Sequence, residues 1–469
     1  MAVLAVLYMC GTGLLLMRVS LISLFPNRVI GGAGGSGVLR DVRTRADLEH
    51  FKIQSIQDGR GHILYRDGRI FPPRRSQLVG WVGLPDVWPA KTRMVREQGR
   101  EGLEDTFDSW LQGRPGFIGT LADVTGRQAS SVRYHVPMSR GADVRTTVDA
   151  SWEARAERAL EAAHVKNGAV VILSARSHEV LALSGVRSGH ASYLPAVTPR
   201  TPGSIFKLVT AAAALESYEV RSDQPFLCDG DSAIHGVGMR CWRVHGRLSF
   251  AEAIAQSCDV TFANVGLMVG GHAIANVASA IGCTGPGLQR IDGHLVLKAA
   301  RAGEVFAGNS KGPWTPGELA NTAIGQQDVS LSPLGAANLA AVVADGGRYE
   351  DAQLIMDAQK DGRAIRWFPS VSRQAIRRDA ATELANAMRE AVTSPLGTAH
   401  ALDDAPTEVA VKTGTAELGG TTNVNAWIIG FAPYRNPTIA FAVYVGDAPS
   451  KLAHHQVFAM TRAVLRGLK

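Results

Sequence analysis

From Thr146 onward the chain alternates apolar strand-like runs with alanine-rich helical runs, and this pattern most restricts the folds it can adopt. A helical stretch at residues 151–165 precedes two apolar runs, AVVILS and EVLALSG, which predict a helix followed by a β-hairpin. We expect three more strands at residues 408–417, 425–433 and 437–446, and a final helix from His455 onward. Short turns between these strands indicate a mostly antiparallel sheet. The expected fold class is α/β or α+β, with the sheet flanked by helices at residues 209–216, 251–256, 336–344 and 381–392.

Composition and charge narrow the class of protein further. Hydrophobic residues make up 46% of the 469 residues and charged residues 19%, which argues against a disordered or fibrous chain. The net charge is +7, and its arginines are scattered rather than gathered into one basic run. This distribution argues against nucleic-acid binding, and it fits either a soluble basic face or a surface near anionic lipid or polymer.

The first segment of the chain is apolar. Residues 2–17 contain no charge, and the apolar character continues past Arg18 to Phe25. A basic residue that reaches toward the interface lengthens the usable span, so we expect a transmembrane anchor at residues 1–25. A cleaved signal peptide is the main alternative and a buried soluble helix the second, although no Lys or Arg precedes the apolar run.

Turn residues separate the rest of the chain into two regions. Residues 26–145 are rich in loops and turn signals, such as RDGR at 66–69 and GRPG at 113–116, and contain no long periodic helix. The regular alternation described above occupies residues 146–469. We therefore expect an anchor, a loop-rich N-terminal region and one large C-terminal domain.

Five cysteines are too few for a disulfide scaffold in a chain of this length. Cys228 and Cys241 bracket a glycine-rich stretch, so the sequence allows either a local disulfide between them or two free thiols. A metal site that uses His235 or His245 is not expected, because the spacing matches no common ligand pattern.

The first candidate catalytic motif is TPGSIFKLVTAAAALE at residues 201–216. Pro202 and Gly203 end a loop, so Ser204 is expected in the first turn of a helix, where the helix dipole favours developing negative charge. Lys207 follows three residues later on the same face, which suits a nucleophile and its base if burial makes the amine less basic. An ordinary surface helix is the alternative, since this pattern also arises by chance.

The second motif is AEAIAQSCDVTFANVG, in which Ser257 lies between two predicted helices. A second hydroxyl near the first pair can pass a proton to a leaving amine. Asp259 can hydrogen-bond the lysine or a substrate amide. The alternative is that Ser257 only caps a helix.

The third motif, EVAVKTGTAELGG at residues 408–420, contains Lys412, Thr413, Gly414 and Thr415, which we expect to interrupt a strand. Gly414 permits close approach of another backbone or a ligand. A cation and two hydroxyls suit a carboxylate, and an edge strand offers a backbone N–H to an oxyanion. A plain strand-to-turn junction is the alternative.

In this order the three motifs resemble those of the penicillin-binding protein and serine β-lactamase superfamily, whose pattern is Ser-x-x-Lys, Ser-x-Asn and Lys-Thr-Gly. The chain is most similar to the class B penicillin-binding proteins, which are membrane-anchored peptidoglycan transpeptidases. The likeness extends to GRGHILYRDGR at 59–69, GREGLEDTFDSWLQGRPG at 99–116, TTVD at 146–149 and AIGQQDVSLSPLGAANLAA from 323. It implies a penicillin-binding transpeptidase fold with an all-helical part, an N-terminal pedestal at residues 26–145 and an extracytoplasmic catalytic domain on a bacterial membrane.

The resemblance also implies a mechanism and partners. Lys207 would deprotonate Ser204, which attacks a D-alanyl-D-alanine stem peptide. The backbone N–H groups of Ser204 and Thr415 would hold the oxyanion, and Ser257 would relay the proton. Lys412, Thr413 and Thr415 would orient the substrate carboxylate. No metal or cofactor is implied, β-lactams would acylate Ser204, and a membrane glycan polymerase of the wall complex is the implied partner.

Two departures from the family pattern leave other functions open. Asp259 stands where the family usually carries Asn, and an ionised Asp259 paired with Lys207 would keep that lysine protonated. A non-catalytic scaffold or penicillin sensor is therefore one alternative to the transpeptidase, and a D,D-carboxypeptidase or β-lactamase is another. The loop-rich N-terminal region is also shorter than the usual pedestal.

Overall fold

The structure of the 469-residue chain is a computed structural model that describes residues 51–56, 59–72, 78–83, 98–114, 116–122, 128–234, 237–370 and 372–468. The chain divides into two compact units. The first comprises Met1–Gly59 and Gly113–Arg140, and the second Arg60–Gln112 and Gly141–Lys469. The expected anchor at residues 1–25 lies outside the described residues.

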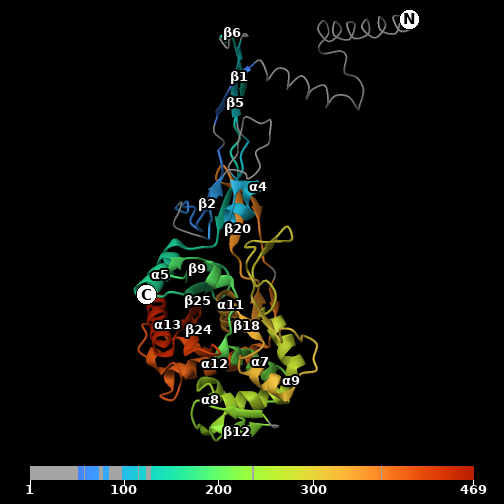
Figure 1. Ribbon diagram of the computed structural model, residues 1–469, viewed down its shortest axis with the longest axis vertical. Coiled ribbons are helices and arrows are strands. Elements are labelled where there is room, and N and C mark those ends of the chain that lie inside the picture. The colour runs from blue at the N-terminus through green and yellow to red at the C-terminus, as the bar shows by residue number, and fades with distance from the viewer. Residues whose placement is uncertain are drawn as a thin grey trace, which may run out of the picture. The chain divides into compact units, whose positions relative to one another are not determined.

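The described part of the first unit is a small antiparallel sheet with the strand order β1-β5-β6 (Figure 1). Its strands are β1 (Phe51–Ile56), β5 (Gly116–Ala122) and β6 (Gln128–Val136).

The second unit contains the whole of the region in which we expected regular structure. Its helices are α3 (Gly102–Thr106), α4 (Asp108–Leu111), α5 (Ala150–Ala162), α6 (Leu194–Val197), the 3₁₀-helix η1 (Gly203–Phe206), α7 (Lys207–Glu216), α8 (Phe250–Ala255), α9 (Asp259–Ala280), α10 (Pro316–Ala323), α11 (Pro333–Ala344), α12 (Arg378–Thr393), the 3₁₀-helix η2 (His400–Leu402) and α13 (Ser450–Leu465). Its strands are β2 (Ile63–Leu64), β3 (Val82–Gly83), β4 (Gln98–Gly99), β7 (Asp143–Thr146), β8 (Gly168–Ser174), β9 (Val180–Arg187), β10 (His190–Ala191), β11 (Pro225–Cys228), β12 (Asp231–Ile234), β13 (Val237–Arg240), β14 (Gly246–Ser249), β15 (Arg290–Ile291), β16 (His294–Leu295), β17 (Gly303–Val305), β18 (Val329–Leu331), β19 (Arg348–Glu350), β20 (Ile355–Lys360), β21 (Arg363–Trp367), β22 (Ser372–Gln374), β23 (Ala410–Glu417), β24 (Asn423–Ala432) and β25 (Ile439–Pro449).

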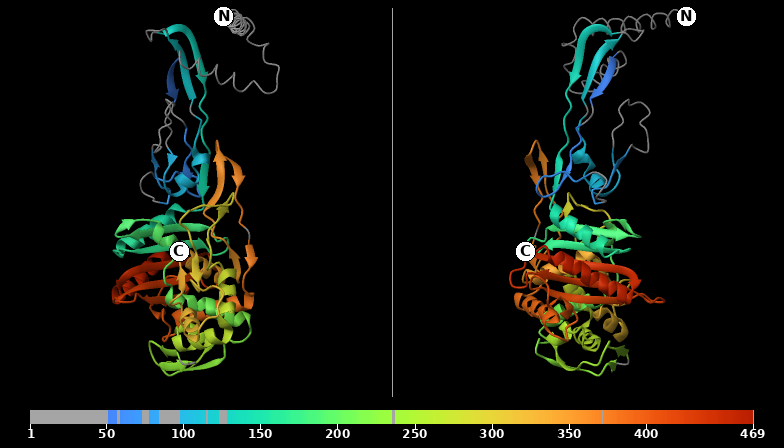
Figure 2. Two further views of the ribbon diagram at one scale, coloured as in Figure 1. Left: turned by 45° about the vertical axis from the view of Figure 1, so that its right-hand side comes forward. Right: turned by 90° about the vertical axis from the view of Figure 1, so that its left-hand side faces the viewer.

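A six-stranded antiparallel sheet with the order β10-β9-β8-β25-β24-β23 forms the centre of this unit. The predicted hairpin is β8 and β9, and the three predicted C-terminal strands are β23, β24 and β25. Figure 2 shows the green hairpin beside the red C-terminal strands, although the two segments are far apart in the sequence. The expected antiparallel sheet flanked by helices is confirmed. The last helix begins at Ser450, one turn before the predicted His455, because Pro449 ends β25 and leads directly into it.

Helices cover both faces of the sheet, and strand β8 shows how. Val170 and Ile172 belong to a buried cluster with residues of α5 and α13, whereas Ala169, Val171 and Leu173 belong to a second cluster with residues of α11. Successive side chains of a strand point to opposite faces, so a strand buried on both faces has a continuous apolar sequence. This packing explains the unbroken run AVVIL.

Helix α5 carries a carboxyl group into this packing. Glu153 is 4% exposed, and it accepts hydrogen bonds from the backbone N–H of Leu183 (2.8 Å) and the hydroxyl of Ser184 (2.8 Å), both on β9. Burial raises the pKa of Glu153 from an ordinary 4.5 to about 7. The folded protein therefore keeps this proton at pH values where the unfolded chain has lost it.

We expect the stability of the wild type to fall as pH rises from about 4.5 to about 7, because the unfolded state releases the Glu153 proton first. The loss is up to about 3 kcal/mol. Glu153→Gln mimics the protonated acid and should remove this slope, whereas Glu161→Gln on the exposed side of α5 should keep it. Denaturant unfolding of the three proteins between about pH 5 and pH 8 checks this, and parallel slopes for all three would contradict it.

A group of helices and short hairpins lies beside the sheet. Helix α9 packs against α7 and α10. In the described part of the chain, α9 alone is both long and apolar enough to cross a membrane, but residues such as Phe262 and Val265 are fully buried within the unit. We therefore interpret α9 as a core helix. Next to it, β11 pairs with β14 and β12 pairs with β13.

Candidate active site

Ser204 lies in η1, a single 3₁₀ turn that leads into α7. The predicted helix start is confirmed, except that its first turn is 3₁₀ rather than α. Lys207 follows at the beginning of α7 and its side chain is fully buried, whereas Ser204 is partly exposed. Within the described residues, no other group hydrogen-bonds the Ser204 hydroxyl, so it is available to a substrate.

Gly203 sets the path of the chain into this turn. Its φ is +54°, a value that favours glycine, and its N–H donates to the Gly325 carbonyl at 2.9 Å. A Cβ at this position would lie 2.2 Å from the carbonyl oxygen of Thr415 on β23. The absence of a side chain at Gly203 therefore lets the serine turn lie directly on the edge strand.

The amine of Lys207 is held by the second motif. Lys207 Nζ donates to Asp259 Oδ1 at 2.7 Å, to the Ser257 carbonyl at 2.9 Å and to Ser257 Oγ at 3.3 Å. The Lys207 side chain is 0% exposed and that of Asp259 is 22% exposed, so water screens the ion pair little. The pairing considered from the sequence is therefore present.

Ser257 occupies the turn between α8 and α9, as predicted. Its φ of +57° is uncommon for a residue with a side chain, and it directs the hydroxyl toward both lysines. Lys412 Nζ donates to Ser257 Oγ at 2.9 Å. Because Ser257 Oγ accepts hydrogen bonds from two amines, its own proton is free for a third partner.

Lys412 is fully buried in β23. Burial lowers the pKa of Lys412 well below its usual value, the positive charge of Lys207 lowers it further, and the negative charge of Asp259 partly opposes both. Lys412 Nζ also donates to the Thr413 carbonyl at 2.9 Å. The Lys412 amine is therefore buried and contacts the Ser257 hydroxyl.

We had expected the third motif to interrupt a strand, and this prediction was wrong. The motif lies within β23, an unbroken strand at the edge of the sheet. Gly414 explains how the strand stays regular: a Cβ there would lie 2.8 Å from both Ile205 Cγ2 and the Pro202 carbonyl oxygen. The missing side chain, and not a break in the strand, makes room for η1.

The two hydroxyls of this motif have partners that the sequence analysis missed. Thr413 Oγ1 donates to Thr398 Oγ1 at 2.7 Å. Thr415 Oγ1 lies 2.8 Å from His454 Nε2 on α13, and His454 Nδ1 lies 2.8 Å from the Ser450 carbonyl. A carbonyl can only accept, so Nδ1 carries the proton and Nε2 accepts from Thr415. No sequence signal pointed to this contact, because Ser450 and His454 both precede the helix that was predicted from His455 onward.

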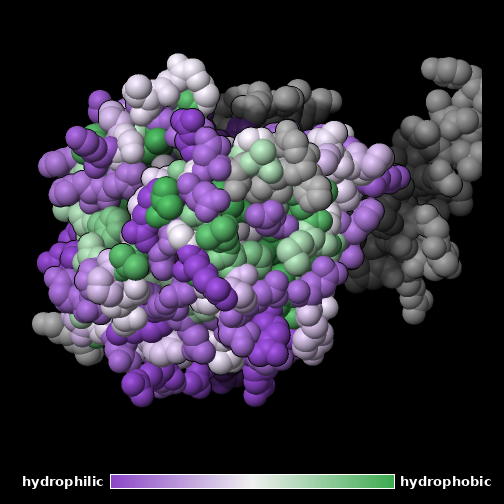
Figure 3. Space-filling model, turned by 90° about the horizontal axis from the view of Figure 1, so that it is seen from below, coloured by the Kyte–Doolittle hydropathy of each residue, from purple (hydrophilic) through white to green (hydrophobic). Residues whose placement is uncertain are grey.

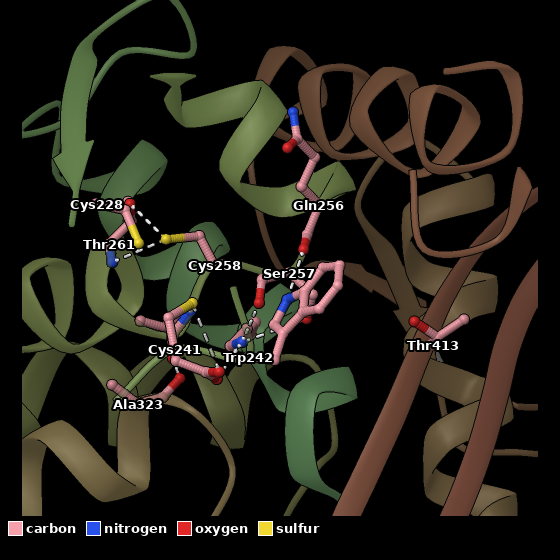
Figure 4. A network of polar contacts seen from close by, with 12 residues as sticks. Cys228, Cys241, Trp242, Gln256, Ser257, Cys258, Thr261, Ala323 and Thr413 are labelled. Atoms are coloured by element: carbon pink, nitrogen blue, oxygen red, sulfur yellow. Dashed lines mark hydrogen bonds and ion pairs between the residues drawn. The ribbon is translucent and has the colours of Figure 1, made fainter. Parts of the chain in front are cut away.

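A segment before the second motif also contacts it. Trp242 Nε1 donates to the Gln256 carbonyl at 3.2 Å, beside Ser257 (Figure 4). Cys228 and Cys241, for which a disulfide was one possibility, are free thiols. We had not expected His245 to be a metal ligand, but its Nδ1 lies 3.5 Å from both sulfur atoms. His235 lies outside the described residues.

Known proteins are similar to this chain in sequence and in fold. Stage V sporulation protein D of Bacillus subtilis is 26% identical over 404 residues, which cover 79% of this chain and 58% of that protein. Peptidoglycan D,D-transpeptidase PbpA of Mycolicibacterium smegmatis is 30% identical over 266 residues, which cover 54% of this chain and 51% of that protein. The chain thus spans little more than half the length of these relatives.

A solved structure and a family description extend the comparison. One chain of a structure described as "Structural coordination of polymerization and crosslinking by a peptidoglycan synthase complex" matches with a TM-score of 0.68 and 21% identity, covering 100% of this chain and 98% of that one. This likeness shows the fold. The family described as "Penicillin binding protein transpeptidase domain" matches residues 168–465, which include every predicted site residue. The chain therefore belongs to the penicillin-binding protein transpeptidase family.

Proposed function

We propose that this protein is a peptidoglycan D,D-transpeptidase that cross-links stem peptides through an acyl-serine intermediate and that binds penicillin at the same serine. One observation carries the proposal: the buried amines of Lys207 and Lys412 converge on Ser257 Oγ, at 3.3 Å and 2.9 Å. Two buried amines and a hydroxyl form a path for protons. Ser204, three residues before Lys207 in the sequence, is partly exposed, which supports its role as the nucleophile at the start of that path.

In the proposed acylation, Lys207 takes the proton of Ser204 as Ser204 Oγ attacks the carbonyl carbon before the terminal D-alanine. The backbone N–H groups of Ser204 and Thr415 stabilise the oxyanion. Two features support this arrangement: Ser204 begins a helical segment, and β23 is an edge strand with backbone groups on its outer side. Thr413, Gly414 and Thr415 receive the substrate carboxylate, with Lys412 behind them.

The leaving D-alanine amine then takes a proton from Ser257, whose oxygen is held by the two lysines. The amine of a second stem peptide attacks the acyl-serine, passes its proton back along the same path and completes the cross-link. This sequence uses each group once as acid and once as base, so the site returns to its starting state.

The Lys207–Asp259 ion pair favours a second candidate function. The Lys207 amine already has a carboxylate partner at 2.7 Å, which would suit a scaffold or penicillin sensor that turns over slowly. Rapid turnover of a stem-peptide donor with an amine acceptor would exclude this candidate, whereas release of free acid instead of the cross-linked product would indicate a carboxypeptidase or β-lactamase.

The placement of the protein in the cell is also part of the proposal. We infer a bacterial membrane anchor at residues 1–25, a pedestal at residues 26–145 and an extracytoplasmic transpeptidase domain at residues 146–469. The solved relative from a peptidoglycan synthase complex supports a membrane glycan polymerase as the partner.

Incubation of the purified full-length protein with a fluorescent penicillin tests the function. We expect one adduct per chain by intact mass, located on the peptide that contains Ser204, and none in Ser204→Ala. Ser217→Ala, at the other end of α7, serves as the matched control and should label like the wild type. Labelling that persists in Ser204→Ala, or its absence from the wild type, would overturn the proposal.

A further inference from the structure

Four potential metal ligands meet next to the second motif, although they come from separate segments. Cys228 ends β11, Cys241 follows β13, His245 precedes β14 and Cys258 precedes α9. Their ligand atoms all lie within 4.8 Å of one another, and the three thiols are buried. The pairing of β11 with β14, which places Cys228 opposite Gly246, brings the ends of this segment together. Figure 4 shows the three cysteine side chains gathered beside Ser257.

The distances suit a tetrahedral ion. Zinc binds sulfur at about 2.3 Å and imidazole nitrogen at about 2.0 Å, so a tetrahedron places the sulfur and nitrogen atoms about 3.5 Å apart. His245 Nδ1 lies 3.5 Å from Cys228 Sγ and 3.5 Å from Cys241 Sγ. The ring nitrogen is therefore already placed at one corner, with two of the three sulfur atoms at the distance that the geometry requires and Cys258 Sγ within 4.8 Å of the other ligand atoms.

We propose that Cys228, Cys241, His245 and Cys258 bind one zinc ion in a closed, structural site. Three sulfur ligands and one imidazole are a typical structural zinc set, and soft thiolates with tetrahedral geometry select zinc over magnesium or calcium. Binding releases three thiol protons and leaves the imidazole neutral, so zinc with three thiolates carries one net negative charge. No electron is transferred, and no oxidant is needed.

Hydrogen-bond donors surround the sulfur atoms, as thiolate ligands require. The backbone N–H of Asp259 donates to Cys241 Sγ at 3.2 Å. The backbone N–H and hydroxyl of Thr261 both donate to Cys258 Sγ, at 3.4 Å and 3.2 Å. These contacts would stabilise the negative charge that metal binding places on sulfur.

The short strands around Cys228, Cys241 and His245 bury few apolar side chains, Met239 and Leu248 among them. The strands are four residues long, and Leu227, Trp242 and Val244 are more than half exposed. Figure 3 views the end of the unit that carries α8 and β12 and shows apolar side chains mixed with polar ones on this surface. Short segments with a small core are commonly stabilised by a metal or disulfides.

The site would also position the proposed proton relay, a consequence that rests on the proposed function. Cys258 directly follows Ser257, whose φ of +57° must be maintained by its surroundings. Arg243 and Trp242 hold Gln256 from the other side, at 2.5 Å and 3.2 Å. Zinc would therefore fix residues 241–245 to residues 256–259 and keep Ser257 Oγ within reach of both lysines.

Metal analysis of the full-length protein, purified in detergent with zinc sulfate and then dialysed, tests the site. We expect about one zinc per chain in the wild type and less than about a tenth of that in Cys258→Ser and His245→Ala. Cys283→Ser, which removes a buried thiol outside the cluster, should keep its zinc. Cobalt in place of zinc should give the visible bands of tetrahedral coordination and a thiolate charge-transfer band, both lost in His245→Ala.

Penicillin labelling distinguishes this inference from the proposed function. Chelation of the zinc should slow acylation of the wild type by roughly tenfold to a hundredfold, and zinc should restore it, but not in His245→Ala. Ser204→Ala should lose labelling and keep zinc. A wild type that labels normally without zinc would overturn the positioning of Ser257 by the metal, and a Cys228–Cys241 disulfide found by peptide mass spectrometry would overturn the site itself. Both results would leave the transpeptidase proposal intact.

Discussion

Lys207→Met is expected to slow acylation by a fluorescent penicillin by roughly a hundredfold to ten-thousandfold, the usual effect of removing a general base. Methionine keeps most of the length and apolar volume of the side chain, so the buried end of α7 should stay packed. What it removes is the amine that contacts Asp259 and Ser257. The second-order rate constant of labelling, followed by stopped time points and intact mass, measures the effect.

Asp259 provides the complementary variant. Asp259→Asn removes the carboxylate that pairs with the Lys207 amine and keeps an oxygen that can accept from it, so we expect labelling about tenfold faster than in the wild type. Lys207→Met alone leaves the Asp259 carboxylate without its partner, and the double variant Lys207→Met/Asp259→Asn removes that carboxylate too. If Lys207 is the base, the double variant should be labelled as slowly as Lys207→Met. If Lys207→Met labels at the wild-type rate while Lys412→Met does not, Lys412 is the base instead.

Gly203→Ala is expected to abolish labelling, a loss of at least a hundredfold, because a Cβ at 2.2 Å from the Thr415 carbonyl must push η1 away from β23. That movement separates Ser204 from the proposed oxyanion site. We also expect a loss of stability of about 1–3 kcal/mol from the strained φ. Labelling rates and denaturant unfolding measure the two effects separately.

Gly189→Ala is the matched control for this variant. Gly189 has a φ of +81°, but a Cβ there would meet no atom within 4 Å. The Gly189→Ala variant therefore has backbone strain without a clash, next to β10, at the edge of the sheet opposite β23. It should be labelled like the wild type. Loss of labelling in both variants would mean that general destabilisation, and not the contact between η1 and β23, explains the result for Gly203.

Much of the site could be predicted from the sequence because its groups are arranged locally. Ser204 and Lys207 are one helical turn apart, and Pro202 and Gly203 mark the start of that turn. The turn that carries Ser257 was readable from the two helices beside it, and β23 from its apolar alternation. These features depend on the conformation of a few neighbouring residues, which the local sequence largely specifies.

The strand break predicted at Lys412 was wrong. Glycine within a strand often marks a bulge, a bend or the close approach of another backbone, and here Gly414 marks a close approach inside a regular strand. Gly414 lies against η1. The amine of Lys412, 155 residues after Ser257 in the sequence, donates a hydrogen bond to Ser257 Oγ at 2.9 Å. No local signal could have shown that contact, because it depends on the packing of α8 and α9 against β23.

The sequence by itself determined the fold class, the order along the chain of the five long strands of the central sheet and the three motifs. Each of these follows from periodicity, turn chemistry or the spacing of a few residues. Only the tertiary structure decided that Asp259 pairs with Lys207, that His454 accepts from Thr415, and that Cys258 joins Cys228, Cys241 and His245. These contacts join segments that are distant in the sequence, and burial and close packing, which no short stretch encodes, bring them within hydrogen-bond distance.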